Sequence, residues 1–127
     1  MLQSRIKVRE NAPICHKKDV YGIYDSGART MTICTDRIFA DGEAQYYINE
    51  TILHESTHVA QSCRIGMTTV GSFGLAKVRT PLSQRRELDL GKSAKISGPN
   101  SYFIEREAFW MEDKPNMVKY VVQKYCL

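Results

Sequence analysis

Two histidines and a glutamate form the pattern H-E-x-x-H at His54, Glu55 and His58. On a helix, residues four apart are rotated by about 40° and displaced by about 6 Å, so both imidazoles can reach one metal ion. The glutamate beside the first histidine can then polarise a metal-bound water. So short a pattern has low specificity alone, since at this composition chance produces it roughly once in 200 chains of this length.

The sequence around the pattern predicts a helix with the histidines on one polar face. At about 100° per residue, His54 and His58 fall within about 40° of each other, and Ile48, Val59 and Cys63 fall on the opposite side. A metal-binding helix has this layout, with one face in the core and the other lining a cleft. The alternative is a solvated polar face that happens to carry two histidines.

Length and composition indicate a single globular domain spanning residues 1–127. Of the 127 residues, 43% are apolar and 25% are charged, and the net charge of +4 is mild. No apolar run of about 18 residues exists that could cross a membrane, and the N-terminus carries no Sec-type signal, so we expect a cytoplasmic protein. Because lysines and arginines are dispersed, the sequence does not suggest nucleic-acid binding.

The four cysteines, Cys15, Cys34, Cys63 and Cys126, include no C-x-x-C pair. A cysteine zinc site is therefore not expected. In the absence of an export signal we expect reduced thiols, with Cys63 in the core. A disulfide between Cys15 and Cys34 is the alternative.

The order of predicted elements gives the class α+β, with a short N-terminal sheet followed by helices. Strands are expected over residues 4–10, 20–24 and 29–35, the last two as a hairpin, and helices over 43–64, 101–112 and 115–125. Residues 67–100 lack a sustained apolar period. We expect them to be mobile and to border the cleft, with one short helix over 82–90.

Glu107 is the predicted third metal ligand. On its helical wheel it has apolar residues within about 60° on both sides, where an unpaired charge would be costly. Glu105 and Glu112 fall at about 160° and 140° from it, nearer to solvent. An arginine is the alternative partner for Glu107. A zinc ion held by two histidines would neutralise the same charge and complete a ligand set.

Strands, an H-E-x-x-H helix and a later Glu-Ala helix form the order seen in gluzincin zinc metallopeptidases, and the sequence resembles their very small members. Glu107-Ala108 matches the family's third ligand and the alanine that often follows it. The segment His58 to Gln61, together with a later Glu-x-Glu-Ala-Phe, is similar to short peptidases of cyanobacteria and their phages. The resemblance covers about a quarter of the chain. The family's aspartate four residues after the third ligand is replaced by Met111, which leaves the surroundings of His54 unassigned.

The resemblance implies a small zincin-like domain in which His54, His58 and Glu107 hold Zn²⁺ and a water takes the fourth position. Glu55 would act as general base during hydrolysis of a peptide or protein substrate. The strand over 29–35 would bind the extended substrate by backbone pairing, or it would be an ordinary interior strand. Four residues are left open as oxyanion donors: Tyr46, Tyr47, Tyr102 and His16.

Competing functions differ in the role of the metal. A non-catalytic zincin-fold protein, such as a phage virion component or a partner-binding module, would keep zinc for stability. Structural zinc sites usually have four protein ligands, whereas three leave a position open, and this favours a peptidase. A basic nucleic-acid binder with an incidental motif is the weakest alternative.

Overall fold

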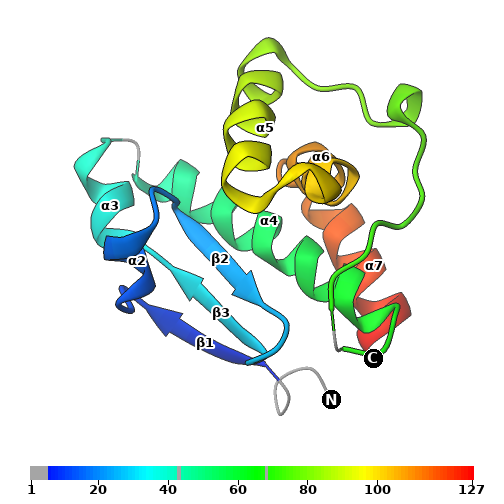
Figure 1. Cartoon of the computed structure of the whole chain (residues 1–127), viewed down its shortest axis with the longest axis horizontal. Coiled ribbons are helices and arrows are strands. Elements are labelled where there is room, and N and C mark those ends of the chain that lie inside the picture. The colour runs from blue at the N-terminus through cyan, green and yellow to red at the C-terminus, as the bar shows by residue number, and fades with distance from the viewer. Residues whose placement is uncertain (1–5, 43, 68) are drawn as a thin grey trace.

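The computed structural model describes residues 6–42, 44–67 and 69–127 and has an α+β architecture, with a three-stranded sheet followed by helices (Figure 1). The elements in order are β1 (Lys7–Glu10), α2 (Ile14–Lys17), β2 (Gly22–Asp25), β3 (Thr30–Ile33), α3 (Thr35–Ala40), α4 (Ala44–Cys63), the 3₁₀ helix η1 (Lys77–Arg79), α5 (Gln84–Ser97), the 3₁₀ helix η2 (Pro99–Ser101), α6 (Tyr102–Met111) and α7 (Pro115–Cys126). The predicted class is therefore confirmed. The expected start of the first strand, at residues 4 and 5, and residue 43 lie outside the described residues.

The sheet has the order β1-β3-β2, so β3 is its central strand. β3 pairs in parallel with β1, where Met31 lies opposite Val8, and antiparallel with β2, where Met31 lies opposite Tyr24. Both edges of β3 are used within the sheet. The expectation that residues 29–35 form a substrate-binding edge strand is therefore wrong, and the alternative of an interior strand is right.

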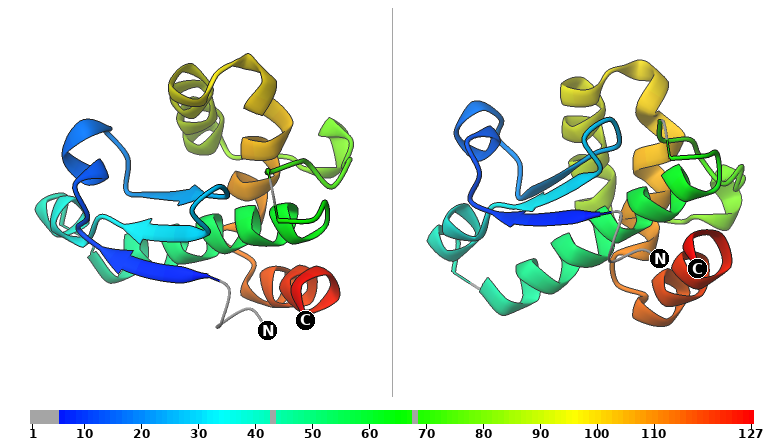
Figure 2. Two further views of the ribbon diagram at one scale, coloured as in Figure 1. Left: turned by 60° about the horizontal axis from the view of Figure 1, so that its bottom comes forward. Right: turned by 90° about the horizontal axis from the view of Figure 1, so that it is seen from below.

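Two apolar cores share α4 (Figures 1 and 2). The first lies between α4, α3 and the sheet and includes Tyr24, Met31, Ile33, Ile38 and Val59. The second lies between α4, α6 and α7 and includes Ala60, Met111, Val118 and Val121. Neighbouring residues of α4 face different cores, so the helix is enclosed on several sides. Side chains on α4 can therefore contact both the sheet half, formed by the strands, α2 and α3, and the helical half, formed by α5, α6 and α7.

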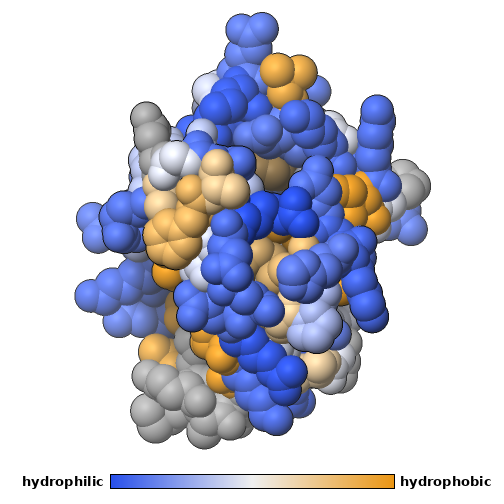
Figure 3. Space-filling model, turned by 90° about the vertical axis from the view of Figure 1, so that its left-hand side faces the viewer, coloured by the Kyte–Doolittle hydropathy of each residue, from blue (hydrophilic) through white to orange (hydrophobic). Residues whose placement is uncertain are grey.

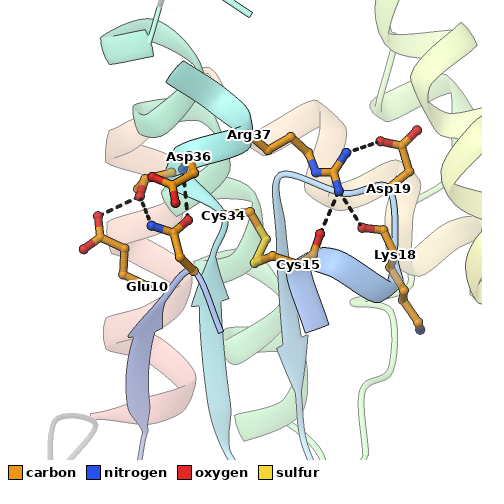
Figure 4. The surroundings of a disulfide bond; sticks show 9 residues. Glu10, Cys15, Lys18, Asp19, Cys34, Asp36 and Arg37 are labelled. Carbon is orange, nitrogen blue, oxygen red and sulfur yellow. Dashed lines mark hydrogen bonds and ion pairs between the residues drawn. A yellow bond between two sulfur atoms is a disulfide. The ribbon is translucent and has the colours of Figure 1, made fainter. Parts of the chain in front are cut away.

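All four cysteines are in disulfides, Cys15–Cys34 and Cys63–Cys126. The expectation of reduced thiols is wrong, because sequence spacing does not reveal which cysteines meet in space. The Cys15–Cys34 bond joins α2 to the residue before α3, and Arg37 reinforces the junction by donating to the Cys15 carbonyl oxygen over 2.7 Å (Figure 4). Disulfides are typical of oxidising surroundings, so they do not support the expected cytoplasmic location.

The segment after α4 contains more helix than predicted. α5 spans fourteen residues, Gln84–Ser97, and its N-cap Ser83 accepts a hydrogen bond from the Arg86 backbone N–H at 3.2 Å. The helix over 82–90 was expected to stop near Gly91, but the helix continues through this glycine. Within the described residues, no helix has the length and apolar character needed to span a membrane.

Candidate metal centre

His54 and His58 project from α4 toward a single carboxylate on α6, that of Glu105. His54 Nε2 lies 3.0 Å from Glu105 Oε1, and His58 Nε2 lies 3.2 Å from Glu105 Oε2. One ligand atom of each residue lies within 4.8 Å of the other two. Zinc binds such atoms at about 2.0–2.2 Å, so two ligands of a tetrahedral site lie roughly 3.3 Å apart. The donor set and its spacing therefore fit a zinc ion held by three protein ligands.

Glu107, the predicted third ligand, lies elsewhere. Its Oε1 accepts hydrogen bonds from Gln61 Nε2 and from the Phe73 backbone N–H, both at 2.8 Å, and its Oε2 accepts from the Leu75 N–H at 3.1 Å. The carboxylate that the structure places beside the two histidines is that of Glu105, and Glu107 lies outside this cluster. Glu107 is only 1% exposed, as the helical wheel implied, but the groups that meet it are amides of the segment after α4 and of α4 itself.

The second nitrogen of each imidazole also has a partner. His54 Nδ1 lies 2.9 Å from Glu112 Oε1, and His58 Nδ1 lies 2.8 Å from Gln61 Oε1. Such outer partners fix the tautomer and ring orientation of metal-binding histidines. Glu112 follows Glu105 by seven residues, which returns it to the same helix face two turns later. It therefore fills the position beside His54 that the sequence left unassigned.

Glu55 lies beside the cluster without a fixed partner. It is 5% exposed, and among the described residues nothing forms a hydrogen bond with its carboxylate. Burial raises the pKa of Glu55, while the positive charges of protonated His54 and His58 act in the opposite direction. A Cβ at Gly22 of β2 would lie 3.2 Å from Glu55 Cγ. Because residue 22 is a glycine, β2 leaves room for the Glu55 side chain.

Without a metal, the cluster is an ion-pair network. Burial opposes the charged forms of both histidines, but hydrogen bonds and charge from the surrounding carboxylates outweigh it and raise the pKa of His54 and of His58. Burial also opposes ionisation of Glu105, yet the two imidazoles outweigh it and lower the pKa of that carboxyl. The surrounding carboxylates thus favour positive charge at the two imidazoles.

A pocket of about 520 Å³ opens beside His54 and Glu55. One wall includes Tyr21 and Gly22 at the start of β2, and another includes Arg85, Asp89 and Lys92 of α5. The other lining residues are Asp19, Val20, Arg37, Asp41, Tyr47, Glu50, Thr51, Ser93, Ile96, Phe109 and Glu112. On the face shown in Figure 3, the surface is mostly hydrophilic, with apolar atoms in separate patches. Most of the lining residues are charged or polar, so the pocket is a largely polar cleft between the sheet and α5.

Of the four candidate oxyanion donors, only Tyr47 lines this pocket. Tyr46 is 49% exposed, and the hydroxyl of Tyr102 accepts a hydrogen bond from Arg106 at 3.3 Å. His16 is exposed on α2, away from the cluster. Tyr47 is thus the candidate that the structure brings to the site.

Four residues at the site were missed from the sequence: Gln61, Arg86, Glu105 and Glu112. The spacing of Glu105 and Glu112 is the signal that could have found two of them, since carboxylates seven residues apart share a helix face. Arg86 donates to Glu112 Oε2 at 2.9 Å and also pairs with Glu50. Nothing in the sequence links α5 to this contact, because it depends on how the helices pack.

The comparison with curated proteins gave no match, and neither did the comparison with solved structures. A family model described as a domain of unknown function, DUF8637, matches residues 1–127. This match covers the whole sequence, including the His54, His58 and Glu105 cluster and both disulfides. The chain therefore belongs to the DUF8637 family.

Proposed function

We propose that the protein is a zinc-dependent peptidase of the gluzincin type, with a zincin-like fold. His54, His58 and Glu105 would hold the metal, and Glu55 would be the general base. The observation that carries the proposal is the convergence of three ligand atoms beside a buried carboxylate that has no hydrogen-bond partner among the described residues. A purely structural ion-pair cluster has no need of such a free carboxylate.

The chemistry that zinc supplies when bound is Lewis-acid activation of water and of a peptide carbonyl. Glu55 takes the proton of the attacking water and passes it to the leaving nitrogen. In the metal-free chain, burial raises the pKa of Glu55, which makes its carboxylate a stronger base than an exposed one. Tyr47 lines the pocket, and its hydroxyl is the donor that we propose for the developing oxyanion.

The free edge of β2 is the proposed substrate-binding strand. β2 pairs with β3 on one side, and on its other side it has no strand neighbour among the described residues. Tyr21 and Gly22 line the pocket there. An extended peptide pairing with this edge would run past Glu55, and main-chain hydrogen bonds of this kind tolerate many sequences.

A second candidate is a non-catalytic structural or partner-binding protein that retains zinc. It is favoured by burial, because His54, Glu55, His58 and Glu105 are all exposed by 9% or less. A closed site of this kind would serve stability rather than turnover.

The two candidates separate in one experiment that pairs zinc content with cleavage of a peptide library. We expect the wild-type chain to bind one zinc and to cleave peptides, and Glu55→Gln to keep the zinc but lose hydrolysis. Glu10→Gln on β1 is the matched control and should retain both. Stoichiometric zinc without cleavage would support the structural role, and no zinc binding at micromolar metal would refute both.

A further inference from the structure

We propose that Gln61 and Glu107 form a positioning relay that holds the His58 imidazole with its Nδ1 protonated and its Nε2 directed at the metal position. The inference deepens the proposed function, since it rests on His58 being a ligand. Neither residue reaches the metal position; both act through His58. The relay runs from the metal helix α4 to α6.

The orientation of the Gln61 amide follows from its partners. Its Nε2 donates to two acceptors, Glu107 Oε1 at 2.8 Å and the Ile104 carbonyl oxygen at 3.0 Å. A flipped amide would put its oxygen against both of these oxygens, so the amide has one acceptable orientation. Its Oε1 must then face His58, and it lies 2.8 Å from Nδ1.

This orientation fixes which nitrogen of His58 carries the proton. Because Gln61 Oε1 can only accept, His58 Nδ1 must donate. In the neutral imidazole, Nε2 then keeps its lone pair, and Nε2 is the atom that faces Glu105 at 3.2 Å. A metal ligand needs this tautomer.

Glu107 completes the relay because it only accepts. Three N–H donors converge on its carboxylate, from Gln61, Phe73 and Leu75. A glutamine at this position would turn an NH₂ group toward one of these donors. An ionised acceptor also strengthens the hydrogen bond from Gln61 and, through the polarised amide, the bond from His58. This gives a physical reason for a carboxylate that is 1% exposed and lies outside the cluster of His54, His58 and Glu105.

Nuclear magnetic resonance of histidine nitrogens tests the relay directly in the wild-type chain. We expect the His58 Nδ1 proton to be observable and protected from solvent exchange, with or without zinc. Gln61→Leu should abolish this protection while preserving side-chain volume. Gln45→Leu is the matched control on the same helix. Among the described residues, the Gln45 side chain bonds only to that of Asn49, at 3.0 Å, so this variant should change nothing at His58.

Zinc affinity, measured by competition with a chelator, gives the second readout. We expect Gln61→Leu to weaken zinc binding by about 10- to 100-fold, the range for outer partners of metal-binding histidines, and Glu107→Gln by about tenfold. The double variant should lose no more than Gln61→Leu alone, because the two residues act through one contact. The cobalt-substituted protein should keep its wild-type absorption spectrum in both variants, whereas Glu105→Ala should alter it.

The outcomes separate this relay from the proposed function. If the wild-type chain binds no zinc, the proposed function fails, and the exchange of the His58 Nδ1 proton still decides the relay. If zinc binds but Gln61→Leu and Glu107→Gln match the wild type, the relay is overturned. A cobalt spectrum of Glu107→Gln that changes as in Glu105→Ala would also overturn it. If Gln61→Leu does not fold, Glu107→Gln and the wild-type spectra provide the decision.

Discussion

At the scale of single residues, three carboxylates on and just after α6 have different roles because they meet different donors. Glu105 meets the two imidazoles of the motif, whereas Glu107 meets neutral amides. Glu112 lies just past the helix and meets both His54 and Arg86. The type of neighbour, and not burial, therefore separates a candidate ligand from a positioning group, since all three are exposed by 9% or less.

Glu112→Gln should weaken zinc binding by about 10- to 100-fold, because the carboxylate orients His54. A glutamine has one oxygen, so its NH₂ group would face either His54 or Arg86. We expect the free energy of unfolding to fall by about 1–3 kcal/mol, the cost of leaving a buried donor unsatisfied. Chelator competition and urea denaturation measure the two effects.

The neighbouring Asp113→Asn is the control for this variant. Its side chain is 46% exposed and lies 3.5 Å from Arg86 Nη1, so its removal should cost less than about 1 kcal/mol. Zinc affinity should be unchanged. Equal zinc affinity in Glu112→Gln and the wild type would show that His54 is oriented by other contacts.

The stability of the metal-free chain should fall as pH rises above about 6.5, the ordinary pKa of histidine. The folded-state pKa values of His54 and His58 are raised, so the stabilisation that they provide is complete below the unfolded pKa and is lost as pH rises through the folded pKa. Each histidine contributes a slope of at most about 1.4 kcal/mol per pH unit.

Zinc should reverse this trend. The metal competes with protons for the imidazoles, so its contribution to stability should grow as pH rises. Urea denaturation at several pH values, with chelator and with zinc, would reveal the two opposite slopes. Parallel slopes would mean that zinc does not bind at the histidines.

At the scale of elements, sequence periodicity located α4 and α7 closely but predicted only the first part of α5. Residues 43–64 were expected as a helix, and α4 spans Ala44–Cys63; the last helix was expected over 115–125, and α7 spans Pro115–Cys126. The short helices α2 and α3 were missed, because four and six residues are too few to display a helical period.

His54 and His58 could be identified as candidate ligands from the sequence because they lie on one element, whereas the carboxylate that meets them depends on packing. A helical wheel gives directions around α6 but does not say which neighbour each direction meets. α6 is enclosed by α4, by α5 and by the segment that holds Phe73 and Leu75. Its charged residues Glu105, Arg106 and Glu107 are therefore all exposed by 9% or less, whereas Phe103 is 47% exposed.

Gly22→Ala should destabilise the contact between β2 and α4. The added Cβ would lie 2.6 Å from Thr51 Cγ2 and 3.1 Å from the Thr32 carbonyl oxygen, so the strand or helix must shift. Overpacking of this kind costs about 1–3 kcal/mol. Because Glu55 lies in the same contact, we expect peptide hydrolysis to fall further than the loss of folded protein explains.

Gly91→Ala is the matched control on α5, where a Cβ would meet nothing within 4 Å. It should leave hydrolysis unchanged and raise the free energy of unfolding by about 0.4–1 kcal/mol, since alanine favours a helix. Thermal melts and turnover rates compare the pair. A Gly22→Ala protein as stable and active as the wild type would contradict the close packing of β2 on α4.

At the scale of the whole molecule, the site lies where the two halves meet. α4 belongs to both cores, and Glu105 and Glu112 reach it from the helical half while β2 approaches Glu55 from the sheet. Each half of the molecule contains one end or both ends of a disulfide. Cys15–Cys34 lies within the sheet half, and Cys63–Cys126 joins the end of α4 to the end of α7.

The two disulfides should therefore contribute differently to stability and to zinc binding. They close loops with sequence separations of 19 and 63 residues. Loop-closure entropy then gives about 3 kcal/mol for Cys15–Cys34 and about 4 kcal/mol for Cys63–Cys126. Only the second bond lies on the metal helix, with Cys63 five residues beyond His58, so its loss should also loosen the end of α4.

We expect the paired substitution Cys63→Ala with Cys126→Ala to lower both the free energy of unfolding and zinc affinity. Cys15→Ala with Cys34→Ala should lower mainly the free energy of unfolding, because its loop lies in the sheet half, away from the ligands. Urea denaturation with chelator measures the first quantity, and chelator competition on the folded proteins measures the second. The opposite result would contradict this prediction. If removing Cys15–Cys34 lowers zinc affinity and removing Cys63–Cys126 does not, the bond at the end of α4 is not needed to hold the ligands. The contacts around Cys15 and Cys34 would then position them instead.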